Sequence, residues 1–353
     1  MRRHVSMSRQ VANAKAAAFG ALLAAALAGC GGGSSGAGAM SGTAGLNSPL
    51  AISQSNANAA AAEAILTPAT LADAAVTPPG IGAATSAVVA PSLGAMDRRV
   101  VQQLTNNGHA APAGTVTVPC AAGGSLTAVT SADGKTLTVT FAGCSEVAGS
   151  SVDGTQTYAN FTLTTQSTSD SASANVTDAL TIVAGPVSFA ESGSYAFSLV
   201  ADKTASGGFS TVKFGLTGSG LAVSASKSGV VFDSVTLTNF EFNFEEDLSV
   251  SPHQLYSSFS YMLASSRLDG EITVTTTEQL KQLLDPAETR LFPYAGQLLI
   301  AGADGVRLQV TILGDETFVP PVGEGQIELQ LDPGSGTFGA PTWLSWATLA
   351  TAG

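Results

Sequence analysis

Beyond the first 29 residues, two histidines could act as a catalytic base. His109 lies in the stretch NNGHAAPAG and His253 in VSPHQLY, and both stretches have the composition of loops. A serine hydrolase needs its histidine beside a nucleophile and a carboxylate, and neither stretch matches the Gly-x-Ser-x-Gly setting of such a nucleophile. We therefore expect His109 and His253 to be exposed loop residues.

Four acidic residues in the stretch EFNFEEDLS could supply the paired carboxylates of a glycoside hydrolase: Glu241, Glu245, Glu246 and Asp247. On one face of a strand, Glu241 and Glu245 would lie about 13 Å apart at about 3.3 Å per residue, which is too far for a retaining pair. Their alternation with phenylalanines indicates a solvated face, and their spacing is not that of an EF-hand. The sequence therefore predicts no enzyme, no metal ion and no cofactor.

The start of the chain is typical of a secretory signal. Residues 1–29 hold four basic residues and no acidic one, and Ala16–Ala28 is an apolar run. As a helix this run spans about 20 Å, less than the roughly 30 Å of a bilayer core. We therefore expect it to direct export and not to span a membrane.

Leu27-Ala28-Gly29-Cys30 resembles the lipobox of bacterial lipoproteins. The resemblance implies that Cys30 is lipidated at its sulfur and becomes the first residue of the mature chain. Acyl burial contributes about 0.8 kcal/mol per CH₂, and a second chain makes the anchor stable. Gly31 after the lipidated cysteine implies the outer membrane. The alternative is cleavage nearby, which leaves Cys30 as a free thiol.

Cys120 and Cys144 are the remaining cysteines. An exported protein meets an oxidising compartment, so we expect a disulfide between them. The alternative, a metal site shared with the histidines, fits no zinc spacing. A two-residue turn at Asp133-Gly134 leaves the cysteines out of register on paired strands, so we expect a bulge at Gly123-Gly124 to bring them together. The bridge would stabilise the fold by roughly 3 kcal/mol.

The charge of the chain limits its partners. The whole chain has 14 basic and 26 acidic residues, and residues 1–29 contain four of the basic residues and none of the acidic ones. The part that remains after export is therefore strongly acidic. This balance excludes a nucleic-acid partner, which requires a basic face.

The composition divides the chain into three parts. Residues 1–29 are the signal peptide, residues 30–92 are a low-complexity flexible tether with possible short helices, and residues 93–353 are rich in alternating polar and apolar residues. Strict alternation with frequent Asp-Gly turns is typical of antiparallel sheet. We predict a mainly β fold, either a large curved antiparallel sheet or an open barrel or sandwich, with few short helices near the N-terminus.

Three local patterns refine this prediction. The apolar positions of VVFDSVTLTNFEFNF change from odd to even numbers near Thr238-Asn239, which predicts a β-bulge there. Residues 95–107 and the stretch TTEQLKQLLD have apolar residues at helical spacing, so each predicts a short helix. Trp343 and Trp346 are three residues apart, so on a strand one would be buried and the other exposed.

Two longer stretches resemble uncharacterised proteobacterial lipoproteins. One is VPCAAGGSLTAVTSADGKTLTVTFAGCSEVAG, with a Cys-x-x-Gly-Gly segment and a second cysteine, and the other runs from LDGEITVTTTEQL to IELQLD. The resemblance implies a β-rich domain and an envelope location, but no activity. Such relatives would have an acidic, glycine-rich loop near the end, whereas LDPGSGTFGAP contains Asp332 alone, which weakens a calcium hypothesis.

These observations favour a lipid-anchored cell-envelope protein whose β domain binds a partner protein or an apolar ligand. A structural or surface-interaction lipoprotein is the alternative, and a hydrolase is the third hypothesis. The expected partners are the membrane, through the lipid anchor, and an apolar ligand or an envelope protein.

Overall fold

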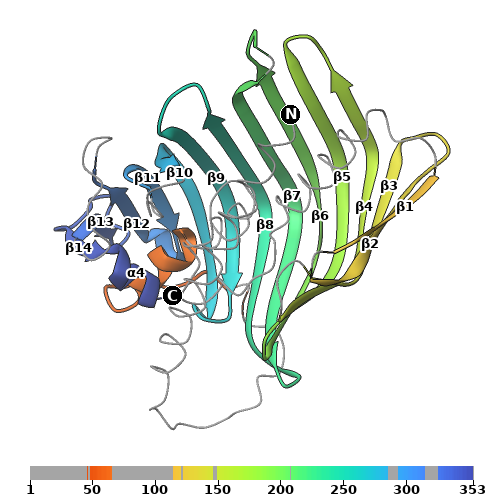
Figure 1. Cartoon of the computed structure of the whole chain (residues 1–353). Coiled ribbons are helices and arrows are strands. Elements are labelled where there is room, and N and C mark those ends of the chain that lie inside the picture. The colour runs from red at the N-terminus through yellow and green to blue at the C-terminus, as the bar shows by residue number, and fades with distance from the viewer. Residues whose placement is uncertain are drawn as a thin grey trace.

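The computed structural model describes residues 46, 48–65, 114–120, 122–145, 149–206, 208–284, 293–314 and 325–352. The strands in these ranges form one antiparallel sheet in which each strand pairs with the next strand along the chain. Figure 1 shows this sheet as a single curved and twisted layer, and it is open, with β1 and β14 at its two edges. The predicted mainly β fold with a large curved sheet is confirmed.

The central strands are the longest and the outer strands are short. The strands are β1 (Gly114–Pro119), β2 (Gly123–Thr130), β3 (Thr136–Ser145), β4 (Ser150–Thr165), β5 (Ser169–Ala184), β6 (Val187–Lys203), β7 (Phe209–Lys227), β8 (Val230–Asp247), β9 (His253–Ser265), β10 (Gly270–Leu284), β11 (Ala295–Ala301), β12 (Arg307–Ile312), β13 (Gly325–Asp332) and β14 (Thr342–Ser345). A 3-10 turn, η2 (Ala303–Gly305), joins β11 to β12, and the helix α4 (Trp346–Ala352) ends the described chain.

One face of the sheet is apolar because apolar residues occupy alternate positions of every long strand. Val176 on β5, Phe197 on β6 and Phe242 on β8 all point to this face and are buried. We call it the inner face and the opposite one the outer face. The alternation in the sequence thus becomes a two-sided sheet, as expected for antiparallel pairing.

The change of apolar phase near Thr238-Asn239 has the predicted cause. Asn239 has a left-handed backbone, with φ of 48°. The pairing of β8 with β9 moves there from Thr238 opposite Met262 to Glu241 opposite Ser260, so one residue of β8 is absorbed. The β-bulge keeps the phenylalanines that follow on the inner face, and the prediction is confirmed.

The predicted helix in TTEQLKQLLD is wrong, because this stretch forms the second half of strand β10. Its residues Leu280–Leu284 pair with β9, from Ser257 to His253. Two irregularities in the pairing with β11, between Thr276 and Lys281, absorb the spacing that resembled a helix. Hydrogen bonds to two neighbouring strands outweigh the modest helix preference of this short segment. The helix predicted over residues 95–107 lies outside the described residues.

Two short helices complete the core at the end of the sheet formed by β9 to β14. Residues 57–65 form one helix, whose buried alanines and Ile65 join the same apolar core as Trp346 and Leu349 of α4. The helix at 57–65 agrees with the expectation of short helices near the N-terminus, but α4 near the C-terminus was not predicted. Trp346 is buried and Trp343 is exposed as expected, although Trp346 begins a helix instead of lying on the strand.

Residues 48–65 lie inside the segment expected to be a tether, yet they pack against the sheet. Leu50 N donates to Glu271 O over 2.8 Å, Glu271 N donates to Ser48 O over 2.9 Å, and the Tyr261 hydroxyl donates to Ala64 O. A buried run of alanines lets the helix approach the sheet closely. The tether prediction for residues 30–92 therefore does not apply to residues 48–65.

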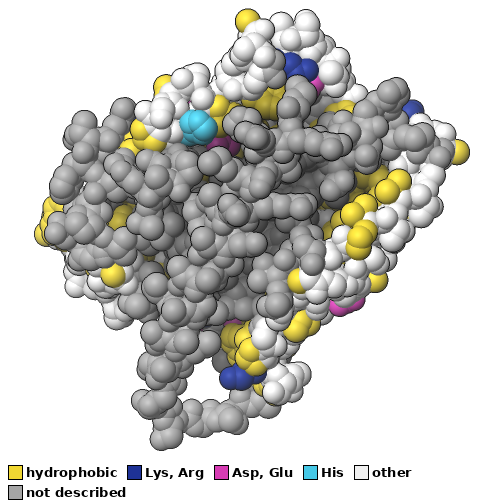
Figure 2. Space-filling model, viewed as in Figure 1, with side chains coloured by type: hydrophobic (Ala, Val, Ile, Leu, Met, Phe, Trp, Pro, Cys, Tyr) yellow, Lys and Arg dark blue, Asp and Glu magenta, His cyan; other side chains and the backbone are white. Residues whose placement is uncertain are grey.

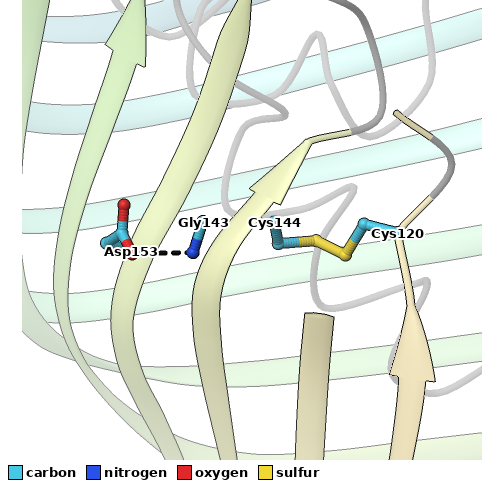
Figure 3. Close-up of a disulfide and its surroundings, with 4 residues drawn as sticks. All are labelled: Cys120, Gly143, Cys144 and Asp153. Atoms are coloured by element: carbon cyan, nitrogen blue, oxygen red, sulfur yellow. Dashed lines mark hydrogen bonds between the residues drawn. A yellow bond between two sulfur atoms is a disulfide. The ribbon is translucent and has the colours of Figure 1, made fainter. Parts of the chain in front are cut away.

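The disulfide between Cys120 and Cys144 is present, with 5.4 Å between the two Cα atoms (Figure 3). The predicted irregularity at Gly123-Gly124 is present, because the pairing of β2 with β3 shifts between Gly123 and Ser125. Cys120 itself lies in the turn between β1 and β2 and not on the strand paired with β3. Cys120 N donates to Gly124 O over 3.2 Å, which closes this turn. A Cβ on Gly124 would lie 2.0 Å from Gly143 O, so this position requires glycine.

Candidate functional site

The histidine proposed at the sequence level as a possible base stands apart from other reactive groups. The prediction that His253 lies in a loop is wrong, because His253 is the first residue of β9 and pairs with Leu284 of β10. Its side chain is 43% exposed, and its Nδ1 lies 3.9 Å from Glu246 Oε1, beyond hydrogen-bond distance. His109 and the proposed lipidation site Cys30 both lie outside the described residues.

The acidic residues of EFNFEEDLS face different neighbours and do not converge. Glu241 is exposed and accepts a hydrogen bond from Asn243 Nδ2 over 2.9 Å, and Glu245 lies 3.6 Å from Lys213 Nζ. Asp247 accepts hydrogen bonds from the hydroxyl and the amide of Ser249, which hold its pKa below the usual value. Within the ranges that the structure describes, no group of three or more His, Cys, Asp or Glu residues could hold a metal ion.

Asp332 is the single acidic residue of the stretch LDPGSGTFGAP, which was considered for calcium binding. Its carboxylate makes contacts within the chain. Its Oδ2 accepts from Arg307 Nη2 over 2.6 Å, and its Oδ1 accepts from the backbone amides of Gly334, Ser335 and Gly336 over 2.8 to 3.1 Å. The Arg307 guanidinium and these donors lower the pKa of Asp332 to about 2. Asp332 therefore closes the loop after β13.

A polar cluster lies instead on the inner face, where the sequence analysis did not place a site. Gln156, Asp178 and Glu191 come from β4, β5 and β6 and are 0%, 2% and 6% exposed. Gln156 is directly opposite Asp178, while Glu191 is opposite Leu180, two residues further along β5. Residues two apart on a strand share a face, so three polar side chains from neighbouring strands meet on the apolar face.

Burial controls the charge of this cluster. The pKa of Asp178 is raised to about 8, first by its removal from solvent and second by the neighbouring carboxylate of Glu191. Two carboxyl groups this close in an apolar setting resist simultaneous ionisation. At neutral pH, Asp178 is therefore mostly protonated and can both donate and accept a hydrogen bond.

Several polar atoms of the cluster lack hydrogen-bond partners in the described part of the chain. The Tyr158 hydroxyl donates to Gln156 Oε1 over 3.2 Å. In the described part of the chain, neither carboxyl oxygen of Asp178 nor Nε2 of Gln156 has a hydrogen-bond partner. Leaving a buried polar group unsatisfied costs about 1–3 kcal/mol, so these atoms weaken the fold unless something else binds them.

The surroundings of the cluster combine small residues with aromatic ones. Gly193 on β6 lies directly opposite Asp178, so no side chain from that position covers the carboxyl group. Farther along the inner face, over β6 to β9, ring centroids lie 5.5 to 6.5 Å apart in a continuous group made of Phe197, Phe214, Phe240, Phe242, Phe244, Phe259 and Tyr261. The inner face thus offers a polar point beside an extended apolar and aromatic surface.

The inner-face side chains of the long strands are buried along the sheet, but the described helices pack on only one part of this face. The helix at 57–65 and α4 supply the core of the β9–β14 end. Over β3 to β8, the described residues include no helix and no second sheet that packs on the inner face. The polar cluster belongs to this second part.

The sequence contains a pattern that indicates this cluster, namely acidic residues at the apolar positions of two strands. In SDSASANVTDALTIVA, Asp178 takes the even-numbered phase of Val176, Leu180 and Ile182, which is the buried phase. Glu191 likewise shares the phase of Phe189 and Tyr195. An acidic residue in the apolar phase of a long strand is unusual. Of the acids at 241–247, Glu241, Glu245 and Asp247 follow a solvated phase, and Glu246 at the end of β8 takes the phase of the phenylalanines.

None of the described helices is long and apolar enough to cross a membrane. Comparison of the chain with protein-family models, with curated proteins and with solved structures finds no match.

Proposed function

We propose that this protein is a lipid-anchored envelope protein whose sheet binds an amphipathic, mainly apolar ligand on the inner face of β3 to β8. The anchor is Cys30, supported by its resemblance to a lipobox at the end of a signal sequence, and the proposed location is the outer membrane. The apolar part of the ligand would lie on the inner face, and its polar end would meet Gln156 and Asp178.

The observation that carries this proposal is the buried, unsatisfied polar pair in an apolar face. Gln156 Nε2 offers a donor, and Asp178 offers a carboxyl group without a partner. A sheet that served only as a scaffold would gain stability from apolar residues at these two positions, because each unsatisfied group is destabilising. Ligand sites commonly combine an apolar lining with a few polar groups that fix orientation.

The chemistry of the pair indicates the polar end of the ligand. With Asp178 protonated and Gln156 offering an amide hydrogen, the site suits an uncharged group that both donates and accepts, such as a hydroxyl. A carboxylate or a phosphate would be disfavoured by Glu191. The proposed ligand class is therefore a long-chain lipid with a hydroxyl-bearing polar end.

The proposed role is binding without catalysis. A carboxyl pair with separated pKa values is also what acid–base catalysis uses, so hydrolysis of a bound lipid is the competing reaction. A structural or surface-interaction role is the other alternative, and it needs no ligand on the inner face.

The test uses the chain from Gly31 onward, which contains every described residue and lacks the proposed anchor. Lipid extracted from the purified protein is identified and quantified by mass spectrometry. We expect one class of hydroxyl-bearing lipid, reduced about tenfold in Asp178→Leu and in Gln156→Leu. Glu241→Gln, which changes an exposed carboxylate on the outer face, is the matched control and should retain the lipid.

Two outcomes would contradict the proposal. Absence of any bound lipid, together with no displacement of an apolar dye by long-chain alcohols, would favour a structural role. Recovery of cleaved lipid that disappears in Asp178→Leu would favour a hydrolase. The anchor is tested separately in the full chain: Cys30→Ala should release the protein from membranes or leave it as an uncleaved precursor, and normal acylation would refute the assignment.

A further inference from the structure

The hairpin between β7 and β8 ends in an exposed apolar tip. Val230, Val231 and Phe232 are 69%, 56% and 52% exposed, although they are consecutive and apolar. The turn before them is a two-residue loop, Ser228-Gly229, and both residues have positive φ. This tight turn matches a type I′ hairpin, so the tip is a defined structure at the end of two long paired strands.

The tip extends beyond the strands beside it. Pairing of β8 with β9 begins at Val235 opposite Ser265, so the tip lies beyond β9. Val230 and Val231 pair with β7, and Phe232 is the extra residue of a β-bulge between them and Asp233. In Figure 1 the β7–β8 hairpin reaches farther than its neighbours at the lower end of the sheet. Figure 2 shows hydrophobic side chains together with a basic side chain at this end.

Both faces of the tip are apolar. Val230 and Val231 are successive paired residues and point to opposite faces. All three residues, including Phe232 at the bulge, are more than half exposed. A protein partner would cover one face of the hairpin and leave the other in water. A bilayer would surround the inserted tip and remove all three side chains from water together, which is the arrangement that the hydrophobic effect favours.

The size of the tip also favours a bilayer over a protein. Three partly exposed side chains of this kind present on the order of 300 Å², well below the roughly 800 Å² per partner of a stable protein interface. The charges nearby suit a lipid surface. Lys227 is exposed at the base of the turn, and Asp233 on the other side is neutralised by Arg267 at 2.8 Å.

We propose that Val230, Val231 and Phe232 form a membrane-docking tip that inserts into a phospholipid bilayer, with Lys227 at the level of the headgroups. The tip would hold one end of the sheet against a membrane. This proposal does not depend on the ligand proposed for the inner face, because a structural lipoprotein could dock in the same way.

The test measures binding of the chain from Gly31 onward to vesicles of phosphatidylethanolamine and phosphatidylglycerol by flotation. The tip variant carries Val230→Ser, Val231→Ser and Phe232→Ser. The matched control carries Phe209→Ser and Val250→Ser, which are exposed at the opposite end of the same strands. Thermal unfolding of each variant shows whether the fold is intact.

We expect the tip variant to lose at least tenfold in vesicle partitioning and the control to change less than twofold. Lys227→Gln should weaken binding about twofold to fivefold, and only to vesicles that contain phosphatidylglycerol. Failure of the parent chain to bind vesicles, or equal losses in tip variant and control, would overturn the proposal. So would self-association that the tip substitutions abolish in a chain that does not bind vesicles, since the tip would then be a protein interface.

Discussion

Two buried aspartates show how differently the two ends of this sheet are built. Asp332, at the β9–β14 end, accepts hydrogen bonds from Arg307 and from a loop of backbone amides, and its pKa falls to about 2. Asp178, on the inner face of β3 to β8, has no hydrogen-bond partner in the described chain, and its pKa rises to about 8. The residue type and the burial are the same, so the partners decide the charge.

The two regions differ in whether their buried polar groups have hydrogen-bond partners in the described chain. At the β9–β14 end, two helices supply apolar side chains to the core, and the buried carboxylate is fully used. On β3 to β8, an equally apolar face carries polar atoms that nothing in the described chain satisfies. We interpret the first region as the part that stabilises the fold and the second as the part that binds.

The largest expected loss of stability is in the core of the β9–β14 end. Leu298→Ala removes a fully buried side chain of β11 and should lower the free energy of unfolding by about 2–5 kcal/mol. Leu180→Ala, next to Asp178 on the inner face, should cost less in lipid-free protein and more when ligand is bound. Denaturant unfolding with and without extracted lipid measures both. Equal losses that do not depend on lipid would remove the distinction between the two regions.

Removal of the disulfide measures how much it stabilises the β1–β3 edge of the sheet. Replacing Cys120 and Cys144 together by serine should lower stability by about 3 kcal/mol, because the unfolded chain regains the freedom of a long loop. Alkylation before and after reduction gives the pairing, and thermal unfolding gives the loss. Two thiols that react without reduction in freshly isolated protein would contradict the bond.

Asp332→Asn should lower the melting temperature by roughly 5–10 °C at neutral pH, because it removes the acceptor of several buried hydrogen bonds. The folded-state pKa is below the unfolded value of about 3.9. The contribution of Asp332 is therefore complete above about pH 4 and is lost as the pH falls towards 2. Thermal unfolding from pH 2 to 7 should show the two proteins converging at the acid end. A constant difference would show that the Asp332 charge is unimportant.

Asp178→Asn should have an effect of the opposite sign. The folded state keeps the proton of Asp178 up to about pH 8, whereas the unfolded chain releases it near pH 4. The parent protein therefore loses stability as the pH rises through this window. The variant should gain up to about 5 kcal/mol over the parent at pH 8 and little at pH 4.

Glu191→Gln tests whether the neighbouring carboxylate contributes to the raised pKa of Asp178. It removes the neighbouring charge and should lower the pKa of Asp178, which narrows the pH window. A lipid-free Asp178→Asn protein that is less stable than the parent at pH 8 would show that Asp178 has a stabilising structural role. That result would contradict the interpretation that Asp178 is an unsatisfied group that destabilises the ligand-free protein.

Much of the fold could be predicted from local patterns. The period-two alternation predicts the antiparallel sheet, and the change of apolar phase predicts the bulge at Asn239. The stretch that became the second half of β10 was misread as a helix, because its spacing of leucines is ambiguous when two bulges interrupt the pairing. Ambiguity of this kind is resolved by hydrogen bonds between strands, which a single short stretch does not reveal.

The site is where sequence reasoning was weakest. The acids at 241–247 are close together in the chain, but Glu241, Glu245 and Asp247 follow the solvated phase of β8, and only Glu246 shares the phase of the phenylalanines. Asp178 and Glu191 are 13 positions apart in the sequence and each is alone in its stretch. Their unusual phase was visible, but their meeting depends on the register of β5 with β6.

The sequence by itself determined the acidity, the cysteine pair and the two-sided character of the strands, and it predicts an export signal that ends in a resemblance to a lipobox. Each of these depends on residue type or on spacing within one segment. Tertiary structure decided that residues 48–65 complete the core, that Asp332 is an ionised carboxylate paired with Arg307 and that Asp178 is mostly protonated at neutral pH. These outcomes depend on which distant groups come within hydrogen-bond distance. A difference of one residue in register would place every side chain of a strand on the other face.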